Sequence, residues 1–123
     1  MNWAVTGSVV LALAVLIGAF GAHALRARLD AYATGIYERA VFYQFVHALG
    51  LLGIGIAIAA HAVPAGTAGI AGGLLLAGII VFSGSLYALA LSGVRAHGAI
   101  TPLGGLAFVA GWITLAVAFA RGA

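Results

Sequence analysis

The sequence predicts an all-α membrane protein, a four-transmembrane-helix bundle that forms a single membrane domain over residues 1–123. Residues 40–94, between Arg39 and Arg95, contain no Asp, Glu, Lys or Arg, and roughly 20 apolar helical residues suffice to cross the ~30 Å hydrocarbon layer. Hydrophobic residues make up 65% of the chain and charged residues 6%, with a mean hydropathy of +1.24. That composition lies outside the range of soluble globular domains, so a lipid environment is expected.

Four apolar runs are separated by turn signals, and each run is long enough to span a bilayer. Pro64 and Gly66 interrupt the central stretch, and Thr67 is placed to accept backbone N–H groups as the N-cap of a third helix. Thr101 followed by Pro102 is typical of an N-cap with proline at the first position of a fourth helix. The predicted helices cover residues 3–24, 37–60, 67–92 and 102–120.

The first run has an alternative interpretation as a signal peptide, because Ala22-His23-Ala24 has the small-x-small form of a cleavage site. The residues before the run carry no basic side chain, and the run is long for the apolar part of a signal peptide. We therefore expect this segment to be retained as a membrane helix.

Arginine residues are distributed unequally between the two ends of the predicted bundle. Arg26, Arg28, Arg39 and Arg95 lie on the face that holds the loops after the first and third helices, and Arg121 alone lies on the other. The positive-inside rule then predicts both termini outside the cytoplasm. The same four arginines are candidate contacts for lipid headgroups, with a solvated basic rim that only sets orientation as the alternative.

Small residues are expected to hold the helices together, because lipid tails are as apolar as leucine and close backbone approach must supply the packing. The candidate helix-packing positions are Gly18, Ala22, Gly53, Gly69 and Gly73, of which the last two form a GxxxG pair. Packing within one chain is the first interpretation. Because four helices bury little surface between them, a homo-oligomer or a partnership with other membrane-protein subunits is also expected.

Polar side chains inside the apolar runs are the candidate functional residues, since such groups are costly in lipid and usually face the bundle interior. Tyr43, Gln44 and His47 share one helix face by their spacing of three and four residues. By the rise per residue we expect the whole polar cluster at a similar depth. The predicted cluster comprises His23, Tyr43, Gln44, His47, Ser83, Ser85 and Tyr87. A hydrogen-bond network between helices is the first interpretation, and a ligand site is the alternative.

Several kinds of chemistry receive no support from the residues present. Cysteine and lysine are absent, which excludes disulfides, thiolate catalysis and Schiff-base formation. The two carboxylates, Asp30 and Glu38, lie at the predicted membrane surface, whereas a proton-coupled pump usually keeps an acidic residue inside the bilayer. A net charge of +3 on short loops indicates lipid contact rather than nucleic-acid binding. We therefore expect no enzyme, no catalytic residues and no nucleic-acid partner.

A cofactor is not expected either. His23 and His47 leave one alternative, because paired imidazoles on neighbouring helices can ligate haem. Two histidines without a carboxylate or thiolate rarely suffice for zinc, so we expect no metal site.

Four ordered motifs carry a resemblance to a known family. They are Gly18-Ala19-Phe20-Gly21-Ala22-His23-Ala24-Leu25, Tyr43-Gln44 with His47-Ala48-Leu49, Ser83-Gly84-Ser85-Leu86-Tyr87, and Gly98-Ala99-Ile100-Thr101-Pro102-Leu103-Gly104-Gly105. Over nearly its whole length the chain resembles the small bacterial membrane-protein family called domain of unknown function four-two-three, which is similar to the eukaryotic transmembrane protein two-five-six group. Where this family often has a glycine after the first histidine, the chain has Ala24.

The resemblance implies a multi-helix protein of the bacterial inner (plasma) membrane and implies no particular activity. Its motif positions coincide with the polar cluster and with Thr101 and Pro102. Two functions are therefore carried forward from the sequence. The first is a non-enzymatic accessory or scaffolding subunit that packs against other membrane proteins or lipid, and the alternative is a binding or transport module for a quinone, haem or neutral solute at the polar cluster.

Overall fold

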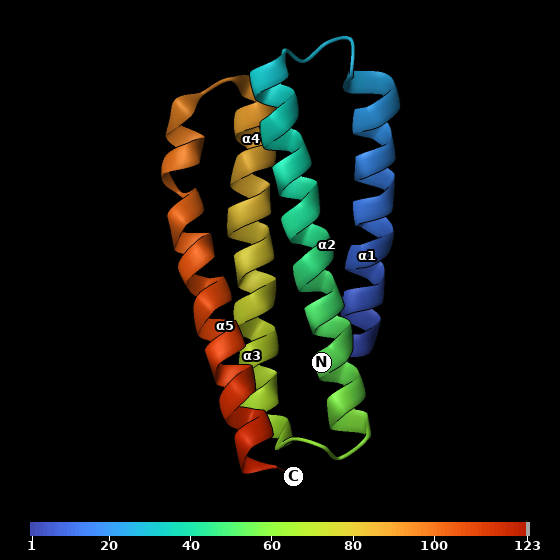
Figure 1. The fold of residues 1–123 in the computed structure, drawn as a ribbon, viewed down its shortest axis with the longest axis vertical. Helices are drawn as coiled ribbons and strands as arrows, with labels where there is room; N and C mark the ends of the chain where they lie inside the picture. Colours follow the sequence, from blue (N-terminus) through green and yellow to red (C-terminus); the bar gives the residue numbers. More distant parts are fainter. Residues whose placement is uncertain (123) are drawn as a thin grey trace.

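The protein is a bundle of long helices that run up and down along one axis (Figure 1), and the computed structural model describes residues 1–122. In chain order the elements are α1 (Trp3–Phe20), the π-helical turn η1 (Gly21–Leu25), α2 (Ala31–Ala59), α3 (Ala65–Gly78), the π-helical turn η2 (Ile79–Ser83), α4 (Gly84–Ser92), the 3-10 turn η3 (Arg95–Ala99) and α5 (Thr101–Arg121). Within the described residues, four helical segments are long and apolar enough to cross a membrane: Trp3–Leu25, Ala31–Ala59, Ala65–Ser92 and Arg95–Arg121. The predicted all-α class with four membrane helices is confirmed.

The helices pack as two pairs joined through α2. The most extensive contacts are those of α1 with α2 and of α3 with α5, and α2 also packs against α3 and α4. Figure 1 shows the loop after α1 at the same end as the connection between α4 and α5, while the link between α2 and α3 lies at the other end with the end of α5. We call these the arginine end and the Pro64 end.

The second helix begins earlier than predicted. It starts at Ala31 rather than at residue 37, and the side chain of Asp30 accepts a hydrogen bond from the Ala33 backbone N–H at 2.8 Å. Because this cap satisfies a backbone donor that the helix start leaves without an intrahelical partner, helical structure is stable two turns before the apolar run begins. At the other end α2 finishes at Ala59, close to the predicted boundary.

Two predicted N-caps are wrong. Helix α3 begins at Ala65 after Pro64, whose extended backbone (φ −63°, ψ 122°) supplies the entry without a capping side chain, so Thr67 lies inside the first turn. Thr101 is itself the first residue of α5, and its hydroxyl contacts Ser85 instead of capping. Pro102 lies in the first turn of α5 as expected, since its missing N–H costs nothing there.

Replacing Asp30 with alanine is expected to fray the first turn of α2 and to lower the free energy of unfolding by about 1 kcal/mol, because the Ala33 N–H loses its acceptor. Asp30→Asn keeps an oxygen in place and is the matched control. Amide hydrogen exchange over residues 31–34 measures the fraying. Equal exchange in the alanine variant and the unmodified protein would show that the cap does not hold the start of the helix.

The glycines that bring helices together are mostly not the predicted ones. A Cβ added to Gly18 would lie 3.3 Å from the Val41 side chain. A Cβ added to Gly69 would lie 3.9 Å from the Trp3 side chain. A Cβ on Gly53 or Gly73 would meet nothing within 4 Å, and Ala22 is exposed. The glycines that a side chain would push into a neighbouring helix or its side chains are Gly7, Gly21, Gly50, Gly55, Gly72, Gly78, Gly104 and Gly111.

Two apolar clusters fill the interior, one toward each end. The cluster toward the Pro64 end is centred on Leu51, Ile54, Leu75, Phe108 and Leu115, and the one at the arginine end on Ile36, Tyr37, Ala40, Leu86 and Ala90. The buried polar side chains Gln44, His47, Ser83 and Ser85 come between these clusters along α2 and along η2 with α4. The interior therefore has a polar layer between two apolar ones.

Candidate functional site

Gln44 is the centre of the polar layer. It is buried on α2, where its Nε2 donates to the Val10 carbonyl of α1 at 3.1 Å. Its Oε1 accepts a hydrogen bond of 2.6 Å from the Tyr87 hydroxyl on α4. One amide side chain thus connects three helices, and both of its ends are occupied.

Two serines join the remaining helices. The Ser83 hydroxyl is almost completely buried and donates to the Ala40 carbonyl of α2 at 2.8 Å. The Ser85 hydroxyl donates to the Phe82 carbonyl at 2.9 Å and lies 2.5 Å from the Thr101 hydroxyl, which connects α4 to α5. These bonds satisfy groups whose burial without a partner would be costly in lipid.

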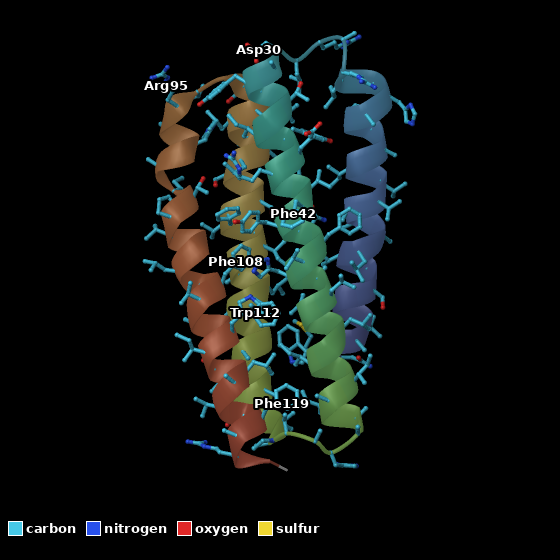
Figure 2. All side chains as sticks on the ribbon, viewed as in Figure 1. Asp30, Phe42, Arg95, Phe108, Trp112 and Phe119 are labelled. Carbon is cyan, nitrogen blue, oxygen red and sulfur yellow. The ribbon has the colours of Figure 1, made fainter. Side chains whose placement is uncertain are left out.

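His47 is held by stacking as much as by hydrogen bonding. Its Nδ1 donates to the Tyr43 carbonyl at 2.8 Å one turn earlier, which fixes the ring orientation. The imidazole lies almost parallel to the Phe108 ring, with 3.4 Å between ring centres and 12° between planes, and Trp112 lies 5.7 Å away. Figure 2 shows Phe108 and Trp112 on α5 at mid-height of the bundle, between Asp30 and Arg95 at one end and Phe119 at the other.

His23 does not join the cluster, so the prediction of one common depth is wrong. It is exposed in η1 at the arginine end, whereas His47 is buried 16 residues after the start of α2, or about 24 Å along that helix. The earlier start of α2 adds about 9 Å to this separation, and the predicted helix bounds already placed His47 about 15 Å into the second helix while His23 lay at the end of the first. The two imidazoles therefore do not form the pair on which the haem alternative depends.

Tyr37 is an interior polar residue that the sequence argument left out. Its hydroxyl donates to the Ile17 carbonyl of α1 at 2.6 Å, and its ring meets that of Tyr87 edge-on at 5.3 Å. Its spacing from Gln44 offered a signal, because residues seven apart share one helix face. Thr101 was singled out for the wrong role, since its hydroxyl bonds to Ser85 across the helix pair.

A recess opens at the arginine end between α1, the following loop and α2. Its volume is about 450 Å³. Its lining residues are Gly18, Gly21, Ala22, Arg26, Leu29, Thr34, Tyr37, Glu38 and Val41. The absence of a side chain at Gly21 leaves room for the Tyr37 ring in the wall of the recess, because a methyl group at Gly21 would overlap that ring. The recess thus combines one basic and one acidic side chain with an aromatic and aliphatic wall.

The four candidate headgroup contacts, Arg26, Arg28, Arg39 and Arg95, are all exposed. Arg26 lines the recess, and Arg95 lines a second, shallower hollow of about 430 Å³ together with Tyr32, Leu89 and Gly98. Arg121 ends α5 at the opposite end of the bundle. The arginines thus have the asymmetric placement that the sequence indicated.

Every buried side-chain nitrogen and oxygen within residues 1–122 has a hydrogen-bond partner. The same part of the chain brings together no group of three or more His, Cys, Asp or Glu residues able to hold a metal ion. The bonds of Gln44, Ser83 and Ser85 lie inside the bundle, whereas Arg26 and Glu38 are exposed charged side chains that line the recess.

Residues 17–105, which include most of the polar layer and the whole recess lining, match the model of the family described as protein of unknown function (DUF423). The chain belongs to the DUF423 family. It is 47% identical over 118 residues to a UPF0382 membrane protein of Staphylococcus epidermidis, covering 93% of this chain and 91% of that protein. It is 44% identical to one of Staphylococcus haemolyticus (92% and 90% covered) and 41% identical to UPF0382 membrane protein YwdK of Bacillus subtilis (93% and 92% covered). No solved structure matches.

The family membership confirms the resemblance carried by the four sequence motifs. The DUF423 relatives are described as membrane proteins, and this chain has four membrane-capable helices, so it is a membrane protein. The match covers about nine-tenths of the length of each of these relatives.

Proposed function

We propose that this DUF423 protein is a non-enzymatic accessory protein of the bacterial inner membrane that associates with lipid and with other membrane-protein subunits. The observation that carries the proposal is a contrast within residues 1–122: every fully buried side-chain nitrogen and oxygen has a hydrogen-bond partner, whereas an open, charged recess lies at one end of the bundle. An interior that satisfies itself supports a structural role for the polar layer. Lipid and other subunits would then bind to the surface of the bundle, including the recess.

The alternative, a module that binds or transports a small ligand at the polar layer, has weaker support. A ligand there would have to displace existing bonds, because Gln44 already holds Val10 and Tyr87, and Phe108 covers the face of His47. Paired polar groups gain little from exchanging one partner for another, since the net contribution of a typical hydrogen bond is only about 1 kcal/mol.

The proposed orientation places the arginine end in the cytoplasm and both termini outside it. Four exposed arginines at one end against Arg121 at the other support this orientation through the positive-inside rule. It would bring the recess to the cytoplasmic leaflet, whose anionic lipids attract arginine side chains.

Native mass spectrometry of the protein, extracted in mild detergent at its natural expression level, tests the proposal when combined with an absorption spectrum of the same sample. We expect a reproducible assembly that contains another polypeptide or retained lipid, with no absorption beyond that of the aromatic residues. A bare monomer free of lipid and protein, or a bound chromophore in stoichiometric amount, would contradict it.

A further inference from the structure

The recess between α1 and α2 carries one charge of each sign. Arg26 lies in the loop after η1 and Glu38 lies on α2, and both side chains are exposed. The side-chain hydrogen bonds formed within residues 1–122 involve neither of them. A basic and an acidic group facing one hollow are suited to a ligand with a negative and a positive group of its own.

We propose that this recess binds the headgroup of a zwitterionic phospholipid that bears a primary ammonium group, as phosphatidylethanolamine does. The guanidinium of Arg26 binds the phosphate, because its planar set of N–H donors matches phosphate oxygens in pairs. The carboxylate of Glu38 accepts hydrogen bonds from the ammonium group. The assignment deepens the lipid-binding part of the proposed function and rests on it.

The wall of the recess favours a lipid over a water-soluble phosphate compound. Gly18 and Val41 continue the lining along the membrane-spanning parts of α1 and α2, so the hollow extends from the charged loop toward the hydrocarbon region. The Tyr37 hydroxyl is already bonded to the Ile17 carbonyl, which leaves its ring as an apolar surface. A volume of about 450 Å³ is within the range of small-molecule sites and accommodates a headgroup with its glycerol.

Glu38 makes the site selective among phospholipids. A primary ammonium group donates charge-assisted hydrogen bonds to a carboxylate, whereas the quaternary ammonium of phosphatidylcholine has no N–H to donate. The uncharged glycerol of phosphatidylglycerol offers Glu38 no positive charge. The expected order of affinity is therefore phosphatidylethanolamine above both other lipids.

Native mass spectrometry of the full chain, stripped of lipid in mild detergent and titrated with the three dioleoyl phospholipids, tests this order. We expect phosphatidylethanolamine to bind roughly tenfold more tightly than phosphatidylcholine or phosphatidylglycerol. Glu38→Gln should remove that preference. Arg26→Gln should weaken all three lipids by roughly tenfold, because each carries the phosphate.

Arg28→Gln and Arg39→Gln are matched controls, since each removes the same charge from an exposed neighbour that does not line the recess. Both should keep the order of affinity and leave the affinities for the two lipids without net charge, phosphatidylethanolamine and phosphatidylcholine, unchanged. All four substitutions are at exposed positions, and circular dichroism checks that each variant is folded. Equal binding of the three lipids by the unmodified protein, or an effect of Arg28→Gln equal to that of Arg26→Gln, would overturn the assignment.

Two further results separate this inference from other accounts. Binding of glycerophosphoethanolamine to the lipid-stripped protein as tightly as dioleoyl phosphatidylethanolamine would overturn a lipid as the occupant, because the acyl chains would then contribute nothing to the affinity. Retained lipid without selectivity would overturn the headgroup site and would leave the accessory function standing.

Discussion

Replacing Gly55 with alanine is expected to lower the free energy of unfolding by about 2–3 kcal/mol, among the largest effects of a single methyl group in this chain. Gly55 lies on α2 where α1 crosses it, and a Cβ there would stand 2.7 Å from the Cα of Ala4 and overlap its backbone nitrogen. A backbone cannot rotate away as a flexible side chain can. The methyl group would therefore have to separate α1 from α2.

Gly53→Ala is the matched control. Gly53 lies two residues before Gly55, on another face of α2, and nothing lies within 4 Å of the added methyl group. Its stability should stay within about 1 kcal/mol of the original or rise, because alanine has the higher helix propensity. Unfolding by increasing denaturant in a fixed detergent, followed by circular dichroism, measures both variants. A loss at Gly53 as large as that at Gly55 would show that the packing face of α2 is placed wrongly.

Replacing Gln44 with leucine is expected to destabilise the bundle by about 1–2 kcal/mol, at the upper range of hydrogen-bond contributions measured between membrane helices. The substitution removes the acceptor of the Tyr87 hydroxyl and the donor to the Val10 carbonyl at once. The Tyr87 hydroxyl would lose its acceptor, and the Val10 carbonyl would keep only its bond within α1. The same denaturant titration measures the loss.

A double-mutant cycle isolates the bond between Gln44 and Tyr87. In the presence of Gln44→Leu, the further change Tyr87→Phe should cost less than it does alone, because the hydroxyl has already lost its acceptor. Ser8→Ala is the control, since the Ser8 hydroxyl bonds only to the Ala4 carbonyl on the exposed side of its own helix. Additive effects of the two substitutions would contradict a direct bond.

The fold class could be predicted because lipid imposes a simple rule on the sequence. The charge-free residues 40–94 admit only helical spans, and Pro64 divides them into two. The start of α2 was harder, because residues 31–36 are neither charged nor continuous with an apolar run. Asp30, whose carboxylate caps the helix, could have indicated this start, but it lies outside the apolar pattern from which the helices were predicted.

The rotation of each helix could not be predicted. In a soluble bundle the apolar stripe marks the inner face, but in lipid both faces are apolar, so glycine position alone does not say which side is buried. Gly53 and Gly55 look alike in the sequence and face opposite surroundings in the bundle. The π-helical turn η2 adds to the difficulty, because its wider turn changes the phase between α3 and α4.

The interior polar residues were easier to predict than their partners. The cost of burying Gln44, Ser83 and Tyr87 in lipid indicated an inward position, and each does bond to another helix. Two of their acceptors are backbone carbonyls, at Val10 and Ala40, which no side-chain pattern identifies. The recess was not predictable either, because its lining comes from α1, the following loop and α2 together.

The pairing of helices that are consecutive in the chain has a consequence for how the protein enters its membrane. The main interface of α1 with α2 needs no residue of the later spans, and the segments from α3 to α5 form a second hairpin of their own. Insertion can therefore proceed in two steps, each adding a unit whose backbone groups are already satisfied. In the proposed orientation the link between the steps, His61–Pro64, crosses the bilayer, and it carries no Arg, Lys, Asp or Glu to oppose that passage.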